Sequence, residues 1–368
     1  MNKYIGLKIK LGLILCVSLL TCQVGSSTSF ASKAGEGTPI PQSTSSKTTQ
    51  EGKRTFKIVG YIRDRVGEIR PSQFEMVTHI IYASLLPKSD GTIRTIFHPD
   101  KLSEVVDIAH TKGVLVLISV GGWGHKEKFE DLTEKYDTRT NFIKEVVDFV
   151  DAYDLDGVDI DWEFPVSDPK KESAKNYLLL MQGLDAALGE KLLTADVMAQ
   201  DDNRQAILPE VFEVVDFVNI MAYGDAADQH ALLSYAVEAL EYWRGRGIPP
   251  EQLVLGLPFY GRPGTPTYKW LVEVNSNAPY LDKIFYYDKY IYYNGIPAIK
   301  RKTALAIDQA SGVMIWTLDK DTVDDTSLLK AIYETACDAS LCSSEAELPS
   351  WDEVFSIWQK IWDFSIPK

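Results

Sequence analysis

Histidine and cysteine are scarce in this chain, with 5 histidines and 4 cysteines among 368 residues. They form no cluster with the spacing of metal ligands, so the sequence predicts no metal site and no cofactor. Acidic residues also outnumber basic ones, which gives the chain a formal net charge of −14. A strongly acidic chain is a poor partner for nucleic acid, since phosphate binding requires a basic surface.

Long apolar runs are nearly absent. Three lysines precede one such run at residues 11–20, and small and polar residues follow it. This order predicts a secretory signal peptide over residues 1–31, cleaved after Ala31, and therefore a secreted protein. The run is too short to be a permanent membrane span. The residues before Cys22 also resemble a bacterial lipoprotein signal, although Thr21 stands where a smaller residue is usual, so a lipid anchor at Cys22 is the alternative.

The rest of the chain divides by composition. Residues 32–54 are rich in Ser, Thr, Lys and Gly, which predicts a flexible leader. Beyond it, short apolar runs alternate with helical patterns such as those at 102–109, 142–150 and 236–243. The runs are 56–62, 77–86, 114–122, 155–163, 191–199, 214–223, 253–261 and 312–318. Eight strands with intervening helices predict an α/β fold, a (β/α)8 TIM barrel forming one catalytic domain over residues 55–336.

Two segments depart from this alternation. Residues 262–311 are longer than one helix requires and contain an aromatic-rich stretch at 284–293, which we interpret as a rim loop or as an ordinary excursion with buried tyrosines. Residues 337–368 carry apolar side chains at helical spacing, which predicts a helical extension packed on the barrel, with a surface-binding module as the alternative. Cys337 and Cys342 are either a small-loop disulfide or two free thiols.

The most informative pattern is a ladder of acids at alternate positions, Asp159, Asp161 and Glu163. Because strand side chains alternate faces, the three carboxylates point to one side and the apolar residues between them point to the other. Clustered carboxylates repel one another and shift each other's pKa values, so at least one proton is expected to be shared. At the C-terminal end of a barrel strand, the outermost acid, Glu163, is a candidate general acid. A divalent metal site is the weaker alternative, since acids in file on one strand form a poor cage.

These residues resemble a known family, the family 18 glycoside hydrolases, whose chitinases carry an Asp-x-x-Asp-x-Asp-x-Glu signature. The chain matches the signature at residues 156–163 and the third-strand pattern Ser-x-Gly-Gly at 119–122. The resemblance continues through Met-Ala-Tyr at 221–223, Gly-Leu-Pro-Phe-Tyr-Gly at 256–261 and Gly-Val-Met-Ile-Trp at 312–316. It covers about residues 56–335, in the order that the family follows.

The resemblance implies a mechanism in which the acetamido group of the substrate, and no protein carboxylate, attacks the sugar. In that scheme Glu163 protonates the glycosidic oxygen and later activates water, so the configuration is retained. Asp161 holds and polarises the acetamido N–H, and Asp159 shares its proton. Tyr223 donates its hydroxyl to the acetamido oxygen, and Trp316 forms the floor beneath the sugar. Asp156, the first acid of the signature, supports the strand.

The resemblance also implies a set of substrate-binding positions, namely Tyr61, Gly121, Gly122, Trp123 and Met221. The two glycines fit a tight turn equally well. Two departures from the family pattern affect this set. Gly224 stands where the family has an acid directly after the sixth-strand tyrosine, so Asp225, one residue later, is the predicted replacement. Ser84 stands where an aromatic residue is usual near the end of the second strand.

Together these observations predict a secreted, monomeric hydrolase of β-1,4-linked N-acetylglucosamine polymers, most simply chitin. Residues 262–311 are too short for the large insertion domain of some relatives, which favours a shallow groove and endo-type cleavage. The same acetamido chemistry also serves peptidoglycan, spore-cortex or N-glycan endo-β-N-acetylglucosaminidases. A non-catalytic chitin-binding lectin on the same fold is the alternative from another class, and the intact Glu163 argues against it.

Overall fold

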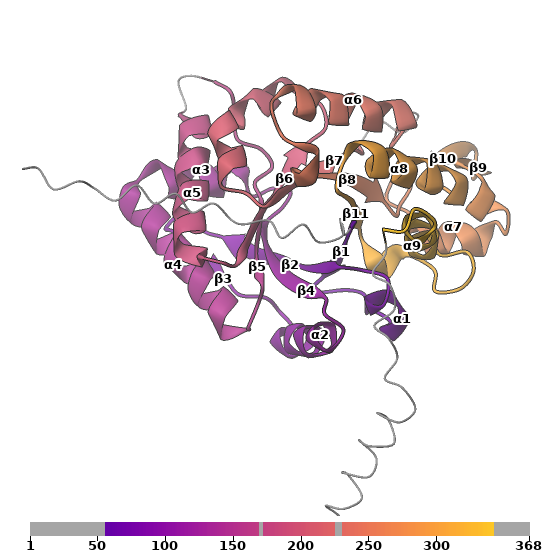
Figure 1. The fold of residues 1–368 in the computed structure, drawn as a ribbon, viewed down its shortest axis with the longest axis horizontal. Helices are drawn as coiled ribbons and strands as arrows, with labels where there is room; N and C mark the ends of the chain where they lie inside the picture. The colour runs from indigo at the N-terminus through magenta and orange to yellow at the C-terminus, as the bar shows by residue number, and fades with distance from the viewer. Residues whose placement is uncertain (1–55, 169–171, 225–229, 342–368) are drawn as a thin grey trace, which may run out of the picture. The chain divides into compact units, whose positions relative to one another are not determined.

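The computed structural model describes residues 56–168, 172–224 and 230–341, and its centre is a barrel of parallel strands (Figure 1). The barrel strands are β1 (Lys57–Arg63), β2 (His79–Pro87), β4 (Leu115–Gly121), β5 (Gly157–Asp161), β6 (Leu192–Met198), β7 (Phe217–Met221), β8 (Leu253–Pro258) and β11 (Gly312–Trp316). Each of the predicted strands is present, with ends that differ by a few residues. The (β/α)8 barrel prediction is therefore confirmed.

The barrel closes because β1 pairs in parallel with both β11 and β2. From β11 the order continues through β8, β7, β6, β5 and β4 back to β2. A short strand, β3 (Ile93–Arg94), adds an antiparallel edge to the end of β2. Since all barrel strands run the same way, their C-terminal ends meet at one mouth, where barrel enzymes place their chemistry.

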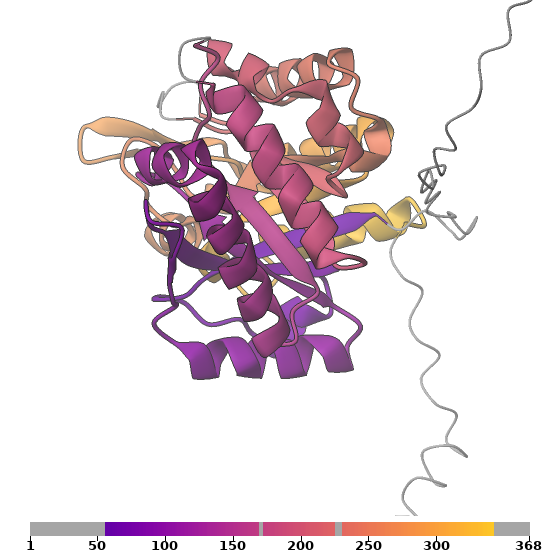
Figure 2. The ribbon, with the colours of Figure 1, turned by 90° about the vertical axis from the view of Figure 1, so that its left-hand side faces the viewer.

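Helices cover the outside of the barrel (Figures 1 and 2). They are α1 (Pro71–Phe74), α2 (Pro99–Thr111), α3 (Lys126–Glu134), α4 (Tyr136–Ala152), α5 (Ser173–Leu188), α6 (Leu233–Gly245), α7 (Tyr268–Val274), α8 (Ile296–Gln309) and α9 (Leu328–Asp338). The alternation is irregular between β6 and β7, where only the 3₁₀ helices η1 (Asp202–Ala206) and η2 (Pro209–Glu213) connect the strands. Further 3₁₀ helices are η4 (Pro250–Gln252), η5 (Ala278–Tyr280) and η6 (Leu318–Lys320).

The apolar core has two parts, as expected of strands that alternate inward and outward side chains. The larger part fills the space between strands and helices; Val158 and Ile160 of β5 belong to it. The smaller part lies inside the barrel and includes Val59, Ile81 and Leu117. The interior also holds buried polar side chains from β5, β6 and β7, and these build the site described below.

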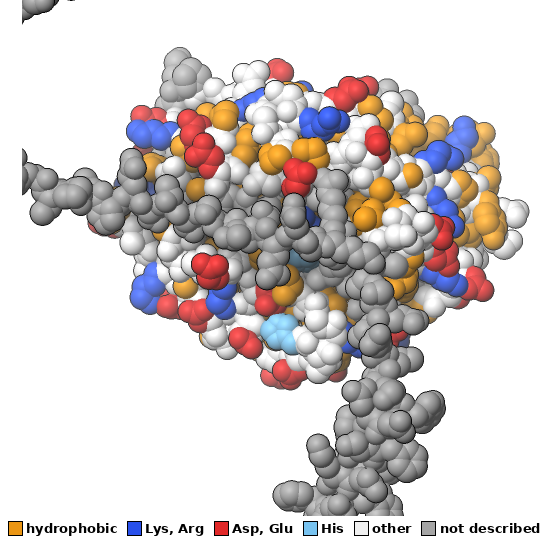
Figure 3. Space-filling view, in the orientation of Figure 1, with side chains coloured by type: hydrophobic (Ala, Val, Ile, Leu, Met, Phe, Trp, Pro, Cys, Tyr) orange, Lys and Arg blue, Asp and Glu red, His pale blue; other side chains and the backbone are white. Residues whose placement is uncertain are grey.

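The aromatic stretch at 284–293 falls on a β-hairpin, a regular structure that the sequence analysis did not predict. Strands β9 (Lys283–Tyr286) and β10 (Lys289–Tyr292) pair antiparallel. The two residues that join them, Tyr287 and Asp288, both have positive φ, at 43° and 58°, which is the geometry of a tight hairpin turn. Ile284 and Ile291 are buried beneath the hairpin. A group of hydrophobic side chains over β9 and β10 is visible in Figure 3, and the charged side chains of both signs are interspersed on the face shown there.

The predicted final helix of the barrel is α9, and Cys337 near its end is disulfide-bonded. The proposed partner, Cys342, lies outside the described residues, as do the predicted signal peptide, the predicted leader and most of the predicted C-terminal extension. The pairing therefore stays a prediction. Within the described residues, no helix combines the length and the apolar character that a membrane span requires.

Candidate active site

The acid ladder occupies the end of β5. As predicted, the acids lie on one face of the strand and the apolar residues between them lie on the other. Asp159 and Asp161 are buried inside the barrel, at 0% and 6% exposure, and Glu163 follows the strand in a half-buried position. Trp162 points the other way and stacks on Phe129 of α3, with ring centroids 5.0 Å apart. The apolar contacts on the outer face thus fix the direction of the acids on the inner face.

Asp159 is the deepest acid of the ladder, and three side chains donate hydrogen bonds to it. Tyr61 donates to Oδ2 at 2.7 Å, Thr194 donates to Oδ1 at 2.6 Å, and Asn219 donates to Oδ1 at 3.2 Å. Burial raises the pKa of Asp159, and these donors oppose the rise because they stabilise the charged form. Asp159 is therefore held rigidly by β1, β6 and β7.

A fourth acid, Asp196 on β6, lies in the same cluster and was missed by the sequence analysis. The Tyr61 hydroxyl is 3.0 Å from each of its carboxylate oxygens. Burial, followed by the charges of Asp159 and Asp161, raises the pKa of Asp196 well above its ordinary value. The sequence pattern could have revealed Asp196, since it alternates with apolar residues on β6 in the same way as the acids on β5.

Asp161 differs from Asp159 in having an oxygen atom without a partner. Its Oδ1 is buried and accepts no hydrogen bond among the described residues. Burial raises the pKa of Asp161 well above its ordinary value, and the charges of Glu163 and Asp159 raise it further. Buried polar atoms are nearly always hydrogen-bonded, so such an atom at the mouth of a barrel marks a position where a ligand can supply the missing partner.

Two aromatic side chains of the predicted site lie at the same end of the barrel. Tyr223, just after β7, is half-buried, and its hydroxyl lies 3.8 Å from the sulfur of Met314. Burial is the main cause that raises its pKa well above the ordinary value, so the hydroxyl keeps its proton and can donate. Trp316 at the end of β11 packs against Tyr61 at a centroid distance of 5.4 Å. Met221 is half-buried against the inner core beside them.

Tyr61 is fully buried beneath these groups, and its hydroxyl is shared by Asp159, Asp196 and Asn219. The substrate contact at Tyr61 stays a prediction, and the contacts that the structure shows for its hydroxyl are to the acids and to Asn219. Tyr61 thus positions carboxylates from two strands, β5 and β6. The sequence analysis did not predict that Tyr61 contacts these acids.

Gly121, the last residue of β4, and Gly122, which follows it, have different surroundings. Gly121 has φ +118°, and a Cβ there would lie 2.3 Å from the carbonyl oxygen of Asp161, so only glycine allows β4 to approach β5 this closely. Gly122 has φ +95° and donates its N–H to that carbonyl at 2.8 Å. Ser84, at the position where the family has an aromatic residue, donates to the carbonyl of Gly121 at 3.3 Å.

Other predicted positions are less involved in this cluster. Trp123 is 80% exposed and lies outside the buried cluster. Asp225 lies outside the described residues. Gly224 has no positive φ, and among the described residues a Cβ there would meet nothing closer than the Tyr235 hydroxyl at 3.8 Å. A ring nitrogen of His230 lies 2.9 Å from the Gly224 carbonyl and ties it to the barrel.

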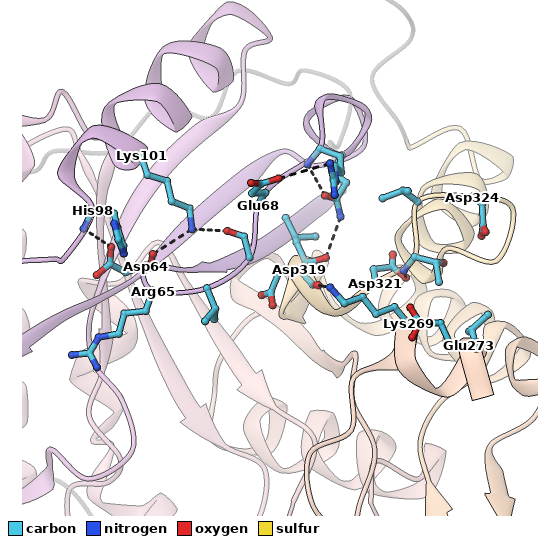
Figure 4. Close-up of a pocket in the computed structure, with 18 residues that line it drawn as sticks. Asp64, Arg65, Glu68, His98, Lys101, Lys269, Glu273, Asp319, Asp321 and Asp324 are labelled. Carbon is cyan, nitrogen blue, oxygen red and sulfur yellow. Dashed lines mark hydrogen bonds and ion pairs between the residues drawn. The ribbon is translucent and has the colours of Figure 1, made fainter. Parts of the chain in front are cut away.

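A cavity of about 800 Å³, with many charged residues in its lining, lies between the loop after β1 and the residues after β11 (Figure 4). Lys101 donates to the carbonyl of Gly67 at 2.8 Å on one side of it, and Lys269 donates to the carbonyl of Asp319 at 2.9 Å on the other. The acids of β5 and β6 are not among its 18 lining residues. The predicted acid residues therefore lie outside this cavity. Within the described residues, no group of three or more His, Cys, Asp or Glu side chains could hold a metal ion.

A barrel with a half-buried glutamate and buried aspartates at the end of one strand can carry the acid–base chemistry that glycoside hydrolases use. The family model for "Glycosyl hydrolases family 18" matches residues 57–321, and the chain belongs to this family. It is a chitinase-like member of the family.

Known proteins agree with this assignment. A chitinase-like effector from Moniliophthora roreri is 30% identical over 213 residues, covering 50% of this chain and 52% of that protein. Chitinase A1 from Niallia circulans is 33% identical over 183 residues, covering 40% of this chain and 26% of that protein. The chain spans only 16% to 52% of the length of the first curated relatives. The crystal structure of the GH18 chitinase ChiB from Flavobacterium johnsoniae superposes with a TM-score of 0.69 at 25% identity, covering 80% of this chain and 100% of that one.

Proposed function

We propose that this protein is a secreted enzyme that hydrolyses β-1,4-linked N-acetylglucosamine polymers, most simply chitin, with retention of configuration through the 2-acetamido group of the substrate. The observation that carries the proposal is the buried Oδ1 atom of Asp161, which lacks a hydrogen-bond donor among the described residues. The N–H of an acetamido group is a donor of the kind that this atom needs. A sugar without the acetamido group would leave the atom unpaired, which costs about 1–3 kcal/mol.

The surroundings of Asp161 fit the same chemistry. Its raised pKa favours a protonated carboxyl in the empty site, and the proton can pass to Asp159 when the acetamido N–H arrives. Tyr223 keeps its phenolic proton and can donate it in a hydrogen bond to the acetamido oxygen as that oxygen attacks. Glu163 is the acid that exchanges a proton with the glycosidic oxygen and then with water.

The test is a panel of soluble chitin oligomers, peptidoglycan and an N-linked glycopeptide, each incubated with the purified protein and with the Glu163→Gln variant. We expect release of oligosaccharides from the chitin oligomers, with mainly internal cleavage. We expect the Glu163→Gln variant to lose about 10²–10⁴-fold in kcat, which is the usual contribution of a general acid. Undiminished hydrolysis by the variant would remove Glu163 from the mechanism.

A carbohydrate-binding protein without activity is the second candidate. Gly224 favours it, because an acid that the family uses at this position is absent. Binding of chitin oligomers by the wild-type protein without any release of product would favour the lectin. Hydrolysis of peptidoglycan or of the glycopeptide in preference to chitin would keep the mechanism and change the substrate.

A further inference from the structure

Lys320 is a buried cation beside the proposed sugar site that no step of the mechanism uses. It is the last residue of η6, four positions after Trp316, and its exposure is only 6%. Its ammonium lies 4.6 Å from the centre of the Tyr260 ring and 5.7 Å from the centre of the Trp316 ring. Tyr260 in turn packs against Tyr223 at a centroid distance of 6.2 Å. The ammonium is therefore next to the rings that surround the proposed site.

Among the described residues, the Lys320 ammonium makes cation–π contacts with these two rings. Neither a hydrogen bond nor an ion pair to its ammonium is present there. The Lys320 ammonium is not one of the fully buried polar atoms without a partner in the described residues, so it keeps some access to solvent. An anion that replaces this solvent would add a charge-assisted hydrogen bond to the cation–π contacts.

The carboxylates that flank Lys320 in the sequence are engaged elsewhere. Asp319 accepts hydrogen bonds from Arg63 and from the hydroxyl of Thr317. Asp321 accepts from the backbone N–H of Leu328 and Leu329 and from the Ser327 hydroxyl, and so caps α9. Both acids line the cavity of Figure 4, and Lys320 does not line it.

The charges around Lys320 also favour an anion. Its pKa is lowered to about 8, first by burial and then by the positive charges of Arg63 and Arg262, while Asp319 acts in the opposite direction. At neutral pH most of the lysine is still protonated. Two cations, Arg63 and Arg262, thus lie near enough to Lys320 to lower its pKa, and Arg63 is itself paired with Asp319.

We propose that Lys320 is a specificity-determining residue that binds a carboxylate substituent of the glycan, next to the sugar at the cleaved position. The inference rests on the proposed function, because it places an amino-sugar polymer at the mouth of the barrel. It deepens that function by extending the substrates to acidic amino-sugar polymers, which are bound more tightly than neutral ones. A carboxylate supplies the charge-assisted hydrogen bond that the ammonium lacks.

The test compares two glycans of equal length: a chitin oligomer, which is neutral, and a peptidoglycan glycan strand freed of peptide, in which alternate sugars carry a lactyl carboxylate. Affinity is measured by calorimetry in the Glu163→Gln background, and kcat and KM are measured with Glu163 intact. Lys320→Met removes the charge at similar length, and Lys320→Arg keeps it. Lys144→Met, which changes an exposed lysine on α4, is the matched control.

We expect the acidic strand to bind about tenfold more tightly than the neutral oligomer. Lys320→Met should abolish this difference in affinity by raising the KM for the acidic strand, with little change for the neutral oligomer. Lys320→Arg should preserve the difference. Equal loss for both glycans in Lys320→Met, or no loss, would overturn the inference. If the wild-type protein binds but hydrolyses neither glycan, the proposed function fails, while a charge-dependent difference in binding would still support the role of Lys320. Thermal unfolding of each variant identifies any that fails to fold.

Discussion

Replacing Asp196 by asparagine is expected to make the stability of the protein less dependent on pH. The pKa of Asp196 is raised well above its ordinary value of 3.8, chiefly by burial and then by the charges of Asp159 and Asp161. The folded protein therefore holds a proton at this site over a pH range in which the unfolded chain has released it. Within that range the free energy of unfolding falls as pH rises, by up to about 1.4 kcal/mol per pH unit for one group.

The range begins at the ordinary pKa near 4 and ends at the raised pKa of the folded state, above which no further loss occurs. Asparagine cannot ionise, so the Asp196→Asn variant lacks this contribution to the slope. Asparagine resembles the protonated carboxyl, and its amide can still donate to Asp159 and accept from Tyr61, so we expect stability near pH 4 within about 1 kcal/mol of the wild type. As pH rises, the variant should become the more stable of the two proteins, because only the wild type loses stability through this group.

The assay is urea unfolding of both proteins at a series of pH values from 4 to 8, read by tryptophan fluorescence. Asp148→Asn, which alters an exposed acid on α4, is the matched control and should leave the slope unchanged. Equal slopes for Asp196→Asn and the wild type would refute the conclusion that the buried cluster retains this proton.

Other predictions concern the backbone and the disulfide. Gly121→Ala should lower the free energy of unfolding by about 2–4 kcal/mol, because its Cβ would lie 2.3 Å from a carbonyl oxygen of β5 at a positive φ. Gly224→Ala, the matched change in open space, should be neutral or slightly stabilising in the same urea assay; a large loss would contradict the open geometry at that position. A bond between Cys337 and Cys342 closes a short loop, and its loss in Cys337→Ser should destabilise by about 2 kcal/mol. The intact mass should rise by two hydrogens on reduction, and an unchanged mass would exclude the bond.

Much of the fold was readable from local patterns in the sequence. The apolar runs predicted each barrel strand, because burial on both faces of a parallel sheet demands nearly continuous apolar residues. The alternation around Asp159 and Asp161 predicted that both would face inward, since the period of two is a property of any strand. The hairpin at 283–292 was missed because its two-residue turn is formed by Tyr287 and Asp288 and not by the Asn-Gly or Asp-Gly pair that usually marks such a turn.

The contacts among the acids were decided by the tertiary structure alone. The hydroxyl of Tyr61 meets Asp159, 98 residues later, and Asp196, 135 residues later, because β1 closes the barrel against β2 and β11. The sequence alone determined which strand carries the acids and which way they face. The closed barrel alone determines which side chains the acids bond and which acids hold a proton. Burial and neighbouring charges depend on strands that are far apart in the chain.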